Sequence, residues 1–420
     1  MQAQVTSIDT PPRYRASLIQ ANHWLEAARR LLNLDALAGP SSWKGLELYV
    51  QPGLRRELQG TVERLVKKGD AMMANVQDTT LPYHHRTAAI EQFKRTYCQV
   101  EQLLDFYADA LVTRTTPETT AMLKACDYMA GHSMRALLQP LGIPTPAVIT
   151  YLDSGIGASI FKAGMPLWDN LESPVAAIKV TRHNLLRPTA LIHEAGHQVA
   201  HLTGWNAELA AALRIGLKKY GLQFANSWAA WASEIAADIF AFVHAGFASV
   251  AALHDVVDGA SREVFRYAAG DPHPISFLRV LIGTECCRQC YGTGMWDQME
   301  RQWKKKHPLT AARPSTAQLV SASLPRLPEI VRLLLQYPFR GFGSKSITQC
   351  IDAGAAHPEA LQRTAAASGE AFYTSAPLLL RGPMARLAWN GYQIIAAPAR
   401  APFYLQQQQA WMLLLGNSIQ

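Results

Sequence analysis

The sequence has few charged residues and no long uninterrupted apolar run. Of its 420 residues, 17% are charged and 49% are hydrophobic, a balance typical of a folded globular protein and not of a disordered chain. The longest apolar region, residues 228–250, is interrupted by Glu234, Asp238 and His244. A bilayer strongly disfavours such groups, so we expect a buried core helix here and no membrane span.

Cysteine is also scarce. Six cysteines in a chain of this length do not make a disulfide framework. Cys287 and Cys290 form a C-x-x-C beside Cys286, but no second pair follows at zinc-finger spacing, so we interpret them as free thiols, with a metal site as the alternative. The N-terminus lacks a basic stretch followed by an apolar run. We therefore see no secretory signal and expect a reducing, cytoplasmic location.

The surplus of positive charge is small. Forty Lys and Arg against 32 Asp and Glu give a net charge of +8, which over this length is weak support for nucleic-acid binding. The densest basic segment, residues 301–307, is interpreted as a solvent-exposed helix end. We expect no nucleic-acid partner, and the sequence leaves the oligomeric state open.

Residues 190–199 contain an H-E-x-x-H sequence in an apolar helical context. Residues four apart share a helix face, so His193 and His197 can present two imidazoles to one metal ion. Glu194 projects about 100° away from His193, where it can act on a water as a general base. The spacing therefore predicts two zinc ligands and a base, and the alternative is a coincidence of two histidines. His201 continues the series but lies about 12 Å along the axis from His193, too far to bind the same ion.

A zinc site of this kind needs a third protein ligand. Glu234 and Asp238 are the only carboxylates in a strongly apolar helical run, and they lie four apart on one face. Burying two carboxylates together is costly, and a bound cation removes that cost. We expect Glu234 to bind zinc and Asp238 to accept the other ring N–H of a ligating histidine. The alternative is an exposed polar stripe on an amphipathic helix.

The pattern of apolar residues predicts mostly helix, including helices over 87–112 and 117–138. Two β-rich runs, 147–152 and 175–181, predict a small sheet of two to four strands, with a turn at 153–157. The H-E-x-x-H helix should begin near Pro188 and end near Gly204. We expect the second β-rich run to be an exposed edge strand that can hydrogen-bond an extended peptide beside the metal.

The motifs together resemble a known group of enzymes. His193-Glu194-x-x-His197, followed by a separate helix with Glu234 and Asp238, is similar to the gluzincin zinc metallopeptidases. In that group the two histidines and the later glutamate bind zinc, and the motif glutamate is the base. A further segment, Gly270–Val280 with a His-Pro and a later arginine, resembles the CAAX-prenyl-protease-like zinc peptidases. The resemblance covers roughly residues 145–285. Those relatives commonly carry membrane spans or a signal sequence, so their substrates are not carried over.

That further segment contributes two candidate residues. His273 precedes Pro274 at an expected helix start, where an imidazolium is favoured only beside an anion. An oxyanion formed during hydrolysis is such an anion, so His273 is a candidate catalytic residue. Arg279 is a candidate for binding a substrate carboxylate or carbonyl. For Arg279 the structural alternative is a salt bridge that ties this segment to the zinc helices.

The sequence thus predicts a zinc metallopeptidase that hydrolyses a peptide or protein substrate. Its expected fold is mainly α with a small β-sheet: a helical domain over 1–140, a zincin-like core over 141–300 and a helical domain over 301–420. Two alternatives remain. One uses Asp238 as the third ligand, as in ATP-dependent peptidases with an HEAGH helix, although no phosphate-binding G-x-x-x-x-G-K-[ST] loop occurs. The other is a helical interaction or scaffold protein with a structural or vestigial zinc site.

Overall fold

The computed structural model describes residues 12–40, 42–43, 53–155, 158–163, 173 and 175–419. The chain forms two compact units, one from residues 1–115 with 164–174 and one from residues 116–163 with 175–420. Most described residues lie in helices, and one sheet of three strands is present among them. The predicted class, mainly helical with a small sheet, is therefore confirmed. The two units are described separately.

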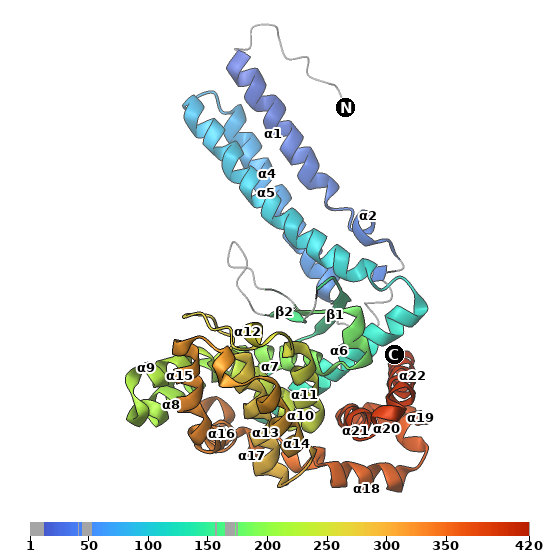
Figure 1. The fold of residues 1–420 in the computed structure, drawn as a ribbon. Coiled ribbons are helices and arrows are strands. Elements are labelled where there is room, and N and C mark those ends of the chain that lie inside the picture. Colours follow the sequence, from blue (N-terminus) through green and yellow to red (C-terminus); the bar gives the residue numbers. More distant parts are fainter. Residues whose placement is uncertain are drawn as a thin grey trace. The chain divides into compact units, whose positions relative to one another are not determined.

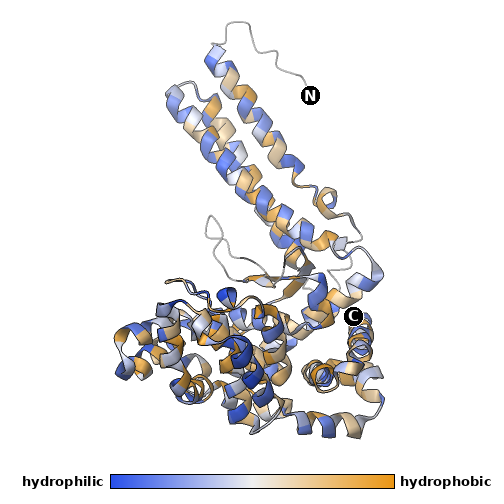
Figure 2. Ribbon diagram, in the orientation of Figure 1, coloured by the Kyte–Doolittle hydropathy of each residue, from blue (hydrophilic) through white to orange (hydrophobic). Residues whose placement is uncertain are grey.

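The first unit contains long helices that lie side by side (Figure 1). Its described helices are α1 (Pro12–Arg30), α2 (Asp35–Ala38), α4 (Gly53–Gln77) and α5 (Tyr83–Val112). Apolar residues at helical spacing face inward, and Figure 2 shows the alternation of polar and apolar residues along each helix. Gly69 allows α4 to approach its neighbours, because a Cβ at this position would lie 2.7 Å from Leu25 and 2.9 Å from Phe93.

The second unit holds the sheet. Its strands are β1 (Val148–Leu152), β2 (Ser159–Phe161) and β3 (Ala176–Val180), in the order β1-β3-β2. β1 runs parallel to β3, and β2 pairs antiparallel to β3. The prediction that residues 175–181 form an edge strand is wrong, because β3 is the central strand. The edge strands are β1 and β2, and the three residues of β2 are too few to show the alternation by which a strand is recognised in sequence.

Two helices flank this sheet where sequence signals place them. α6 (Pro117–Leu138) begins after Thr116, whose hydroxyl accepts a hydrogen bond from the backbone N–H of Thr119. α7 (Thr189–Thr203) contacts β2, β3 and α6. It ends at Gly204, which has a φ of 70°, a conformation that glycine adopts without strain. The predicted H-E-x-x-H helix is therefore confirmed, including its two ends.

The apolar region 228–250 is not one helix, contrary to the prediction. It comprises the end of α9 (Leu222–Ala230), all of α10 (Ala232–Ala245) and the start of α11 (Phe247–Val257). Gly246 has a φ of 55° between α10 and α11, so the chain turns there at little conformational cost. The region is largely buried. Among the described residues, no helix combines the length and apolarity that crossing a membrane requires.

The remaining helices complete the second unit. They are α8 (Trp205–Leu217), α12 (Ser261–Val264), α13 (Ser276–Tyr291), α14 (Met295–Lys306), α15 (Pro314–Ser323), α16 (Leu327–Gln336), α17 (Ile347–Cys350), α18 (Pro358–Ser368), α19 (Ala371–Thr374), α20 (Ala376–Arg381), α21 (Pro383–Ala396) and α22 (Ala401–Ser418). Short 3₁₀ helices join them or precede them, at Gln139–Leu141, Arg182–Leu186, Lys218–Tyr220, Leu309–Ala311, Leu324–Arg326, Arg340–Phe342, Ala353–Ala356 and Pro398–Arg400.

The C-terminal helices belong to the same unit as the sheet. α21 packs against α10 and α11, and α22 packs against α6. The approach of α22 is close: a Cβ at Gly416 would lie 1.8 Å from the backbone oxygen of Ala121. The division differs in this way from the three segments expected from sequence, because α6 and residues 301–419 share one unit with the H-E-x-x-H helix.

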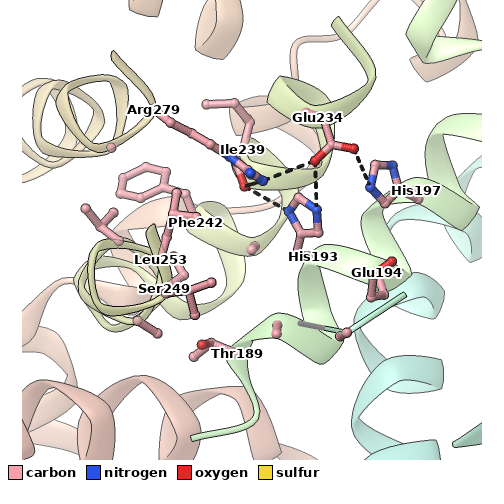
Figure 3. A pocket seen from close by; sticks show the side chains of 18 of the residues that line it. Thr189, His193, Glu194, His197, Glu234, Ile239, Phe242, Ser249, Leu253 and Arg279 are labelled. Atoms are coloured by element: carbon pink, nitrogen blue, oxygen red, sulfur yellow. Dashed lines mark hydrogen bonds and ion pairs between the residues drawn. The ribbon is translucent and has the colours of Figure 1, made fainter. Parts of the chain in front are cut away.

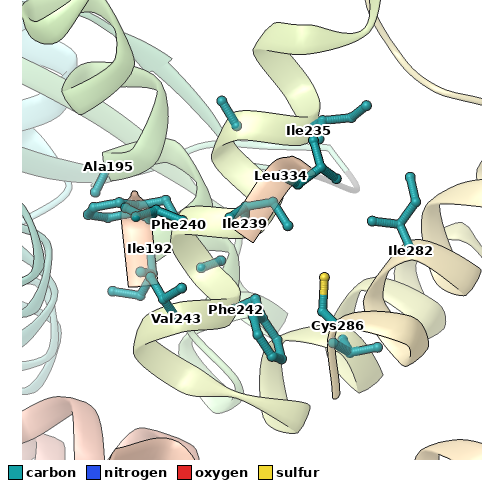
Figure 4. Close-up of a cluster of buried hydrophobic side chains, with 14 of the residues drawn as sticks. Ile192, Ala195, Ile235, Ile239, Phe240, Phe242, Val243, Ile282, Cys286 and Leu334 are labelled. Carbon is teal, nitrogen blue, oxygen red and sulfur yellow. The ribbon is translucent and has the colours of Figure 1, made fainter. Parts of the chain in front are cut away.

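An apolar cluster supports the two helices that carry the motif residues, α7 and α10. Figure 4 shows Ile192 and Ala195 of α7 beside Phe240 and Val243 of α10. All four are buried, at 2% exposure or less. Burying each large side chain of this kind contributes about 1.5–3 kcal/mol. This apolar packing therefore holds α7 and α10 together on the side opposite their polar groups.

Candidate metal centre

Helix α7 presents both histidines of the motif on one face. The ring centroids of His193 and His197 lie 4.8 Å apart, with the ring planes nearly perpendicular at 87°. This follows from their spacing, since residues i and i+4 are neighbours on a helix. His197 is buried, and only 15% of the His193 side chain is exposed.

Gly196 lets α10 approach this face. A Cβ at this position would lie 2.9 Å from both the Cα of Ala237 and the Cβ of Phe240. Any larger residue would therefore push α10 away from α7. The glycine inside the H-E-x-x-H motif thus sets the distance between the histidines and the acidic residues of α10.

Glu234 of α10 faces both imidazoles (Figure 3). Its Oε1 lies 3.3 Å from Nε2 of His197, and its Oε2 lies 3.5 Å from Nε2 of His193. One donor atom from each of the three residues lies within 4.8 Å of the others. Within the described part of the chain, this is the one group of three or more such residues with the spacing to hold a metal ion.

Asp238 lies behind His193, as predicted. Nδ1–H of His193 donates to Oδ1 of Asp238 at 2.8 Å. A neutral imidazole held in this tautomer turns a lone pair, on Nε2, toward the Glu234 carboxylate. Two acceptors face each other there, and a proton or a cation between them removes the repulsion. The arrangement fits a metal ion and also fixes which nitrogen would bind it.

Ser233 has the corresponding position at the other histidine. Its hydroxyl lies 3.5 Å from Nδ1 of His197. Sequence reasoning missed this residue, although it directly precedes Glu234. A lone serine gives no pattern of its own, so only the fold identifies this contact.

Arg279 of α13 is engaged by the acidic residues. Its Nε donates to Oδ2 of Asp238 at 2.5 Å, and its Nη2 donates to Oδ1 of Asp238 at 2.9 Å and to Oε2 of Glu234 at 3.2 Å. Only 12% of the side chain is exposed. Of the two roles expected from sequence, these contacts match the salt bridge, here to Glu234 and Asp238 of α10, and Arg279 also lines the cleft.

The pKa values at this site follow from burial and mutual pairing. Burial acts to lower the pKa of His193, but the hydrogen bond and charge of Asp238 outweigh it and raise that pKa to about 9. Burial acts to raise the pKa of Glu234, yet the two imidazoles and Arg279 bring it below its ordinary value. Asp238 behaves in the same way: Arg279 and His193 outweigh burial and lower its pKa. Both carboxylates are thus held ionised.

Glu194 differs from these two carboxylates. It is 7% exposed and lies at the wall of the cleft. Burial raises the pKa of Glu194, an effect that the nearby His193 and His197 only partly offset. A carboxylate with a raised pKa accepts a proton more readily. This is the property required of the predicted base.

His273 lies at the rim of the same group. Its Nε2 is 3.8 Å from Oε1 of Glu234, and its side chain is 60% exposed. Asp271 orients it, since the Asp271 carboxylate lies 2.8 Å from Nδ1 and accepts the backbone N–H of His273 at 3.0 Å. The Asp-x-His spacing could have indicated this pairing from the sequence, but Asp271 was not predicted. Nε2 is left facing the cleft.

A cleft of about 560 Å³ opens beside these groups. Its walls include His193, Glu194, His197, Glu234 and His273, together with residues 158–160 and 162 at strand β2. Gln198 of α7 holds this strand in place. It accepts from the backbone N–H of Ala163 at 2.8 Å and donates to the backbone oxygen of the same residue at 3.2 Å. The edge strand that borders the cleft is therefore β2, and the β3 prediction is corrected on this point also.

Other residues considered from sequence lie elsewhere. His201 is exposed on α7 and does not line the cleft. Cys286 and Cys287 are buried free thiols, and Cys290 is a half-buried one. They are not part of the metal-binding group found among the described residues. Asp238, the ligand in one alternative, is also outside that group, since its oxygens bond His193 and Arg279.

The chain was compared with known proteins. No protein-family model matches it, and no curated protein or solved structure matches it.

Proposed function

We propose that this protein is a zinc-dependent peptidase whose zinc ligands are His193, His197 and Glu234. The observation that carries the proposal is the convergence of Nε2 of both histidines on the Glu234 carboxylate, in the wall of an open cleft. Two imidazoles and a carboxylate form a donor set that suits zinc. A structural zinc site normally has four protein ligands, whereas a catalytic site has three and an open position. Three converging donors beside a cleft favour the catalytic kind.

The charges support the same conclusion. Glu194, Glu234 and Asp238 contribute three negative charges, and Arg279 contributes one positive charge. As metal ligands the imidazoles are neutral, so the buried group then carries a net charge of −2, which a divalent cation neutralises. Without a cation, a proton on His193, whose pKa is raised to about 9, offsets one of these charges. Uncompensated buried charge is strongly unfavourable, so a cation of this charge stabilises the site.

The protein's own residues have definite roles in the proposed reaction. A bound zinc ion supplies Lewis-acid chemistry, polarising a carbonyl and making a water more acidic. Glu194 accepts the proton of the water that attacks the peptide carbonyl and passes it to the departing amine nitrogen. As an imidazolium, His273 donates its Nδ1–H to Asp271 and its Nε2–H to the oxygen of that carbonyl as negative charge develops.

Strand β2 gives the substrate a place to bind. It is an edge strand of the sheet, and its residues Ser159 and Ile160 line the cleft. An extended peptide can add to such an edge through backbone hydrogen bonds, which bind it irrespective of side chains. The peptide backbone would then run past Glu194 and the three donors.

The test is zinc-dependent cleavage of a defined peptide mixture followed by mass spectrometry. We expect cleavage products with the zinc-loaded protein, none after chelation, and recovery when zinc is returned. Equal cleavage before and after complete removal of the metal would overturn the proposal. Full zinc occupancy with no cleavage of any peptide would favour the interaction or scaffold protein with a structural zinc site.

A further inference from the structure

The cleft wall beside the start of α7 contains an arginine that is only partly paired. Arg187 follows the 3₁₀ helix Arg182–Leu186 and lies two residues before Thr189, the first residue of α7. Its Nη1 donates to Oδ2 of Asp255 on α11. Its Nη2 is buried and has no hydrogen-bond partner among the described residues. Because a buried N–H without an acceptor is unfavourable and Arg187 lines the cleft, an acceptor atom of a ligand would stabilise it.

A buried asparagine in the same wall adds a second donor. Asn184 is 5% exposed and lines the cleft. Its Oδ1 accepts the backbone N–H of Thr181 at 3.2 Å and the hydroxyl of Thr181 at 2.7 Å. These contacts fix the orientation of the amide, so its NH₂ group remains as a donor. The backbone N–H of Arg187 donates to the backbone oxygen of Asn184 at 3.1 Å, which keeps the two residues adjacent.

The charges of the cleft outside the proposed zinc centre favour an anion. Lys162, which follows β2, lines the cleft together with Arg187. These two residues carry two positive charges against the one negative charge of Asp255. The Asp255 carboxylate is already engaged by Arg187 and by Nδ1 of His254, which lies 3.3 Å away. The remaining carboxylates of the cleft belong to the zinc centre, where the bound ion offsets their charge.

The first turn of α7 adds to this preference. α7 has 15 residues, and its N-cap residue, Pro188, makes no side-chain hydrogen bond to the helix. The N–H groups at such a helix start carry partial positive charge, which attracts an anion. Thr189 and Ala190 of this turn line the cleft beside Arg187. The helix start therefore acts in the same direction as the two donor side chains.

The distance to the zinc donors fits a peptide. Thr189 and His193 are one helical turn apart on α7, about 6 Å along the axis, and both are labelled in Figure 3. Arg187 lies just beyond Thr189. An extended peptide advances about 3.4 Å per residue, so a group beside Arg187 lies about two or three residues from a bond held at the zinc donors.

We propose that Nη2 of Arg187 and the amide NH₂ of Asn184 bind a carboxylate of the peptide substrate. This inference rests on the proposed peptidase function. It adds the substrate class: peptides with an acidic side chain or a chain terminus a short distance from the cleaved bond. Both sources offer the same carboxylate, and a hydrogen bond between a guanidinium and a carboxylate is stronger than one to a neutral amide. The test therefore compares each carboxylate with its amide.

The test measures peptide binding by calorimetry with the zinc-loaded Glu194→Gln variant, which should bind peptides without cleaving them. Acetylated alanine pentapeptides with a free C-terminus are compared with the same peptides ending in an amide. Amidated peptides with one glutamate, moved along the chain, are compared with their glutamine matches. We expect a carboxylate preference of at least about tenfold, the effect of one charged hydrogen bond.

The two comparisons identify the source of the carboxylate. A preference for the free C-terminus assigns the Arg187 site to a chain end, and a preference for glutamate assigns it to an acidic side chain. Equal binding of every carboxylate peptide and its amide match would overturn the inference. So would the absence of binding by any peptide when zinc is bound.

Three variants separate a binding role of Arg187 from a structural salt bridge. Arg187→Gln should abolish the carboxylate preference and leave binding of the amide peptides unchanged. Asp255→Asn removes the partner of Arg187 and retains the guanidinium, so the preference should persist or increase. Arg182→Gln, at an exposed position outside the cleft, should leave the preference unchanged. A preference that survives Arg187→Gln would overturn the assignment to this residue.

The same titrations with metal-free wild-type protein distinguish this inference from the proposed function. If the protein binds no zinc but prefers carboxylate peptides, the Arg187 site is supported and the zinc peptidase is rejected. If it binds zinc fully and shows no carboxylate preference, only the Arg187 site is rejected.

Discussion

Helix α13 carries two arginines, each at the centre of an ion-pair network, and the networks differ in kind. Arg288 pairs with Glu285, Asp297 and Glu300, and Lys304 pairs with Glu300 as well. Each carboxylate of that network has a cation as its partner. Two cations thus pair with three carboxylates in the Arg288 network.

The network around Arg279 has one cation for two carboxylates, Glu234 and Asp238. Glu234 receives only one contact from Arg279, and its two oxygens face the imidazoles of His193 and His197. Burial does not distinguish the networks: the side chains of Glu234 and Asp238 are 11% and 16% exposed, and the carboxylates of the Arg288 network are 8% to 19% exposed. The comparison teaches that clustered charge alone does not mark a metal centre. The Arg279 network differs in that Nε2 of two histidines face one carboxylate, and the proposed metal site depends on this geometry.

The largest expected difference between the networks is in zinc binding after loss of one carboxylate. Glu234→Gln should weaken zinc binding by more than about 100-fold, beyond the range typical of outer partners. Glu285→Gln, the matched change beside Arg288, should leave zinc binding unchanged. Competition with a chelating dye measures both affinities. Equal effects in the two variants would show that the Arg279 network is an ordinary ion-pair network.

The next effect concerns the residue behind His193. Asp238→Asn removes the carboxylate that fixes the His193 tautomer, and we expect zinc affinity to fall by about 10- to 100-fold. Asp297→Asn, which alters a partner of Arg288, is the control and should have no effect. Complete loss of zinc in Asp238→Asn, with retention in Glu234→Gln, would instead make Asp238 the third ligand.

A smaller effect is expected on stability. Gly196→Ala inserts a methyl group into the α7–α10 contact and should destabilise the protein by about 1–3 kcal/mol. Gly131→Ala, in α6 where a Cβ would have no neighbour within 4 Å, should instead stabilise it by about 0.4–1 kcal/mol. Urea unfolding distinguishes the two. A neutral result for Gly196→Ala would mean that the helix spacing is not set by this contact.

The smallest effect near neutral pH concerns His244, a buried histidine outside both networks. Burial lowers its pKa to about 3, with the charge of His132 acting in the same direction. In the unfolded chain the pKa is about 6.5, so the unfolded state binds more protons between these values. Stability should therefore be unaffected at pH 7 and fall as the pH drops below about 6.5.

His244→Gln should reduce that acid sensitivity when unfolding is compared at pH 5 and pH 7. His23→Gln, at an exposed position of α1, is the control and should keep the acid sensitivity of the wild type. If His244→Gln retains the full loss of stability at pH 5, other groups account for it.

Local signals in the sequence were sufficient to predict helix α7 and the polar residues that face it. The spacing of His193 and His197, the glycine at 204 and the paired Glu234 and Asp238 each depend on residues a few positions apart. The structure places Glu234 against both imidazoles and Asp238 against one of them. Helical periodicity predicts such geometry because it fixes which residues share a face.

What the sequence could not predict depends on contacts between distant segments. The position of β2 at the edge of the sheet depends on pairing with β3 and on Gln198, 35 residues from Ala163. The cleft forms where β2, α7, α10, α11 and α13 meet, and no single segment contains its pattern. Arg279 had two open roles in the sequence, because only the fold shows which carboxylates it reaches.

The most direct test of the account compares wild-type protein with Glu194→Gln, measuring zinc content and peptide cleavage on the same samples. Glu194 holds no zinc in this account, so both proteins should contain about one zinc per chain. Cleavage should fall by about 10²- to 10⁴-fold in the variant, the range that a general base contributes. Unchanged cleavage with zinc bound, or less than about half a zinc per chain in the wild type, would contradict the account.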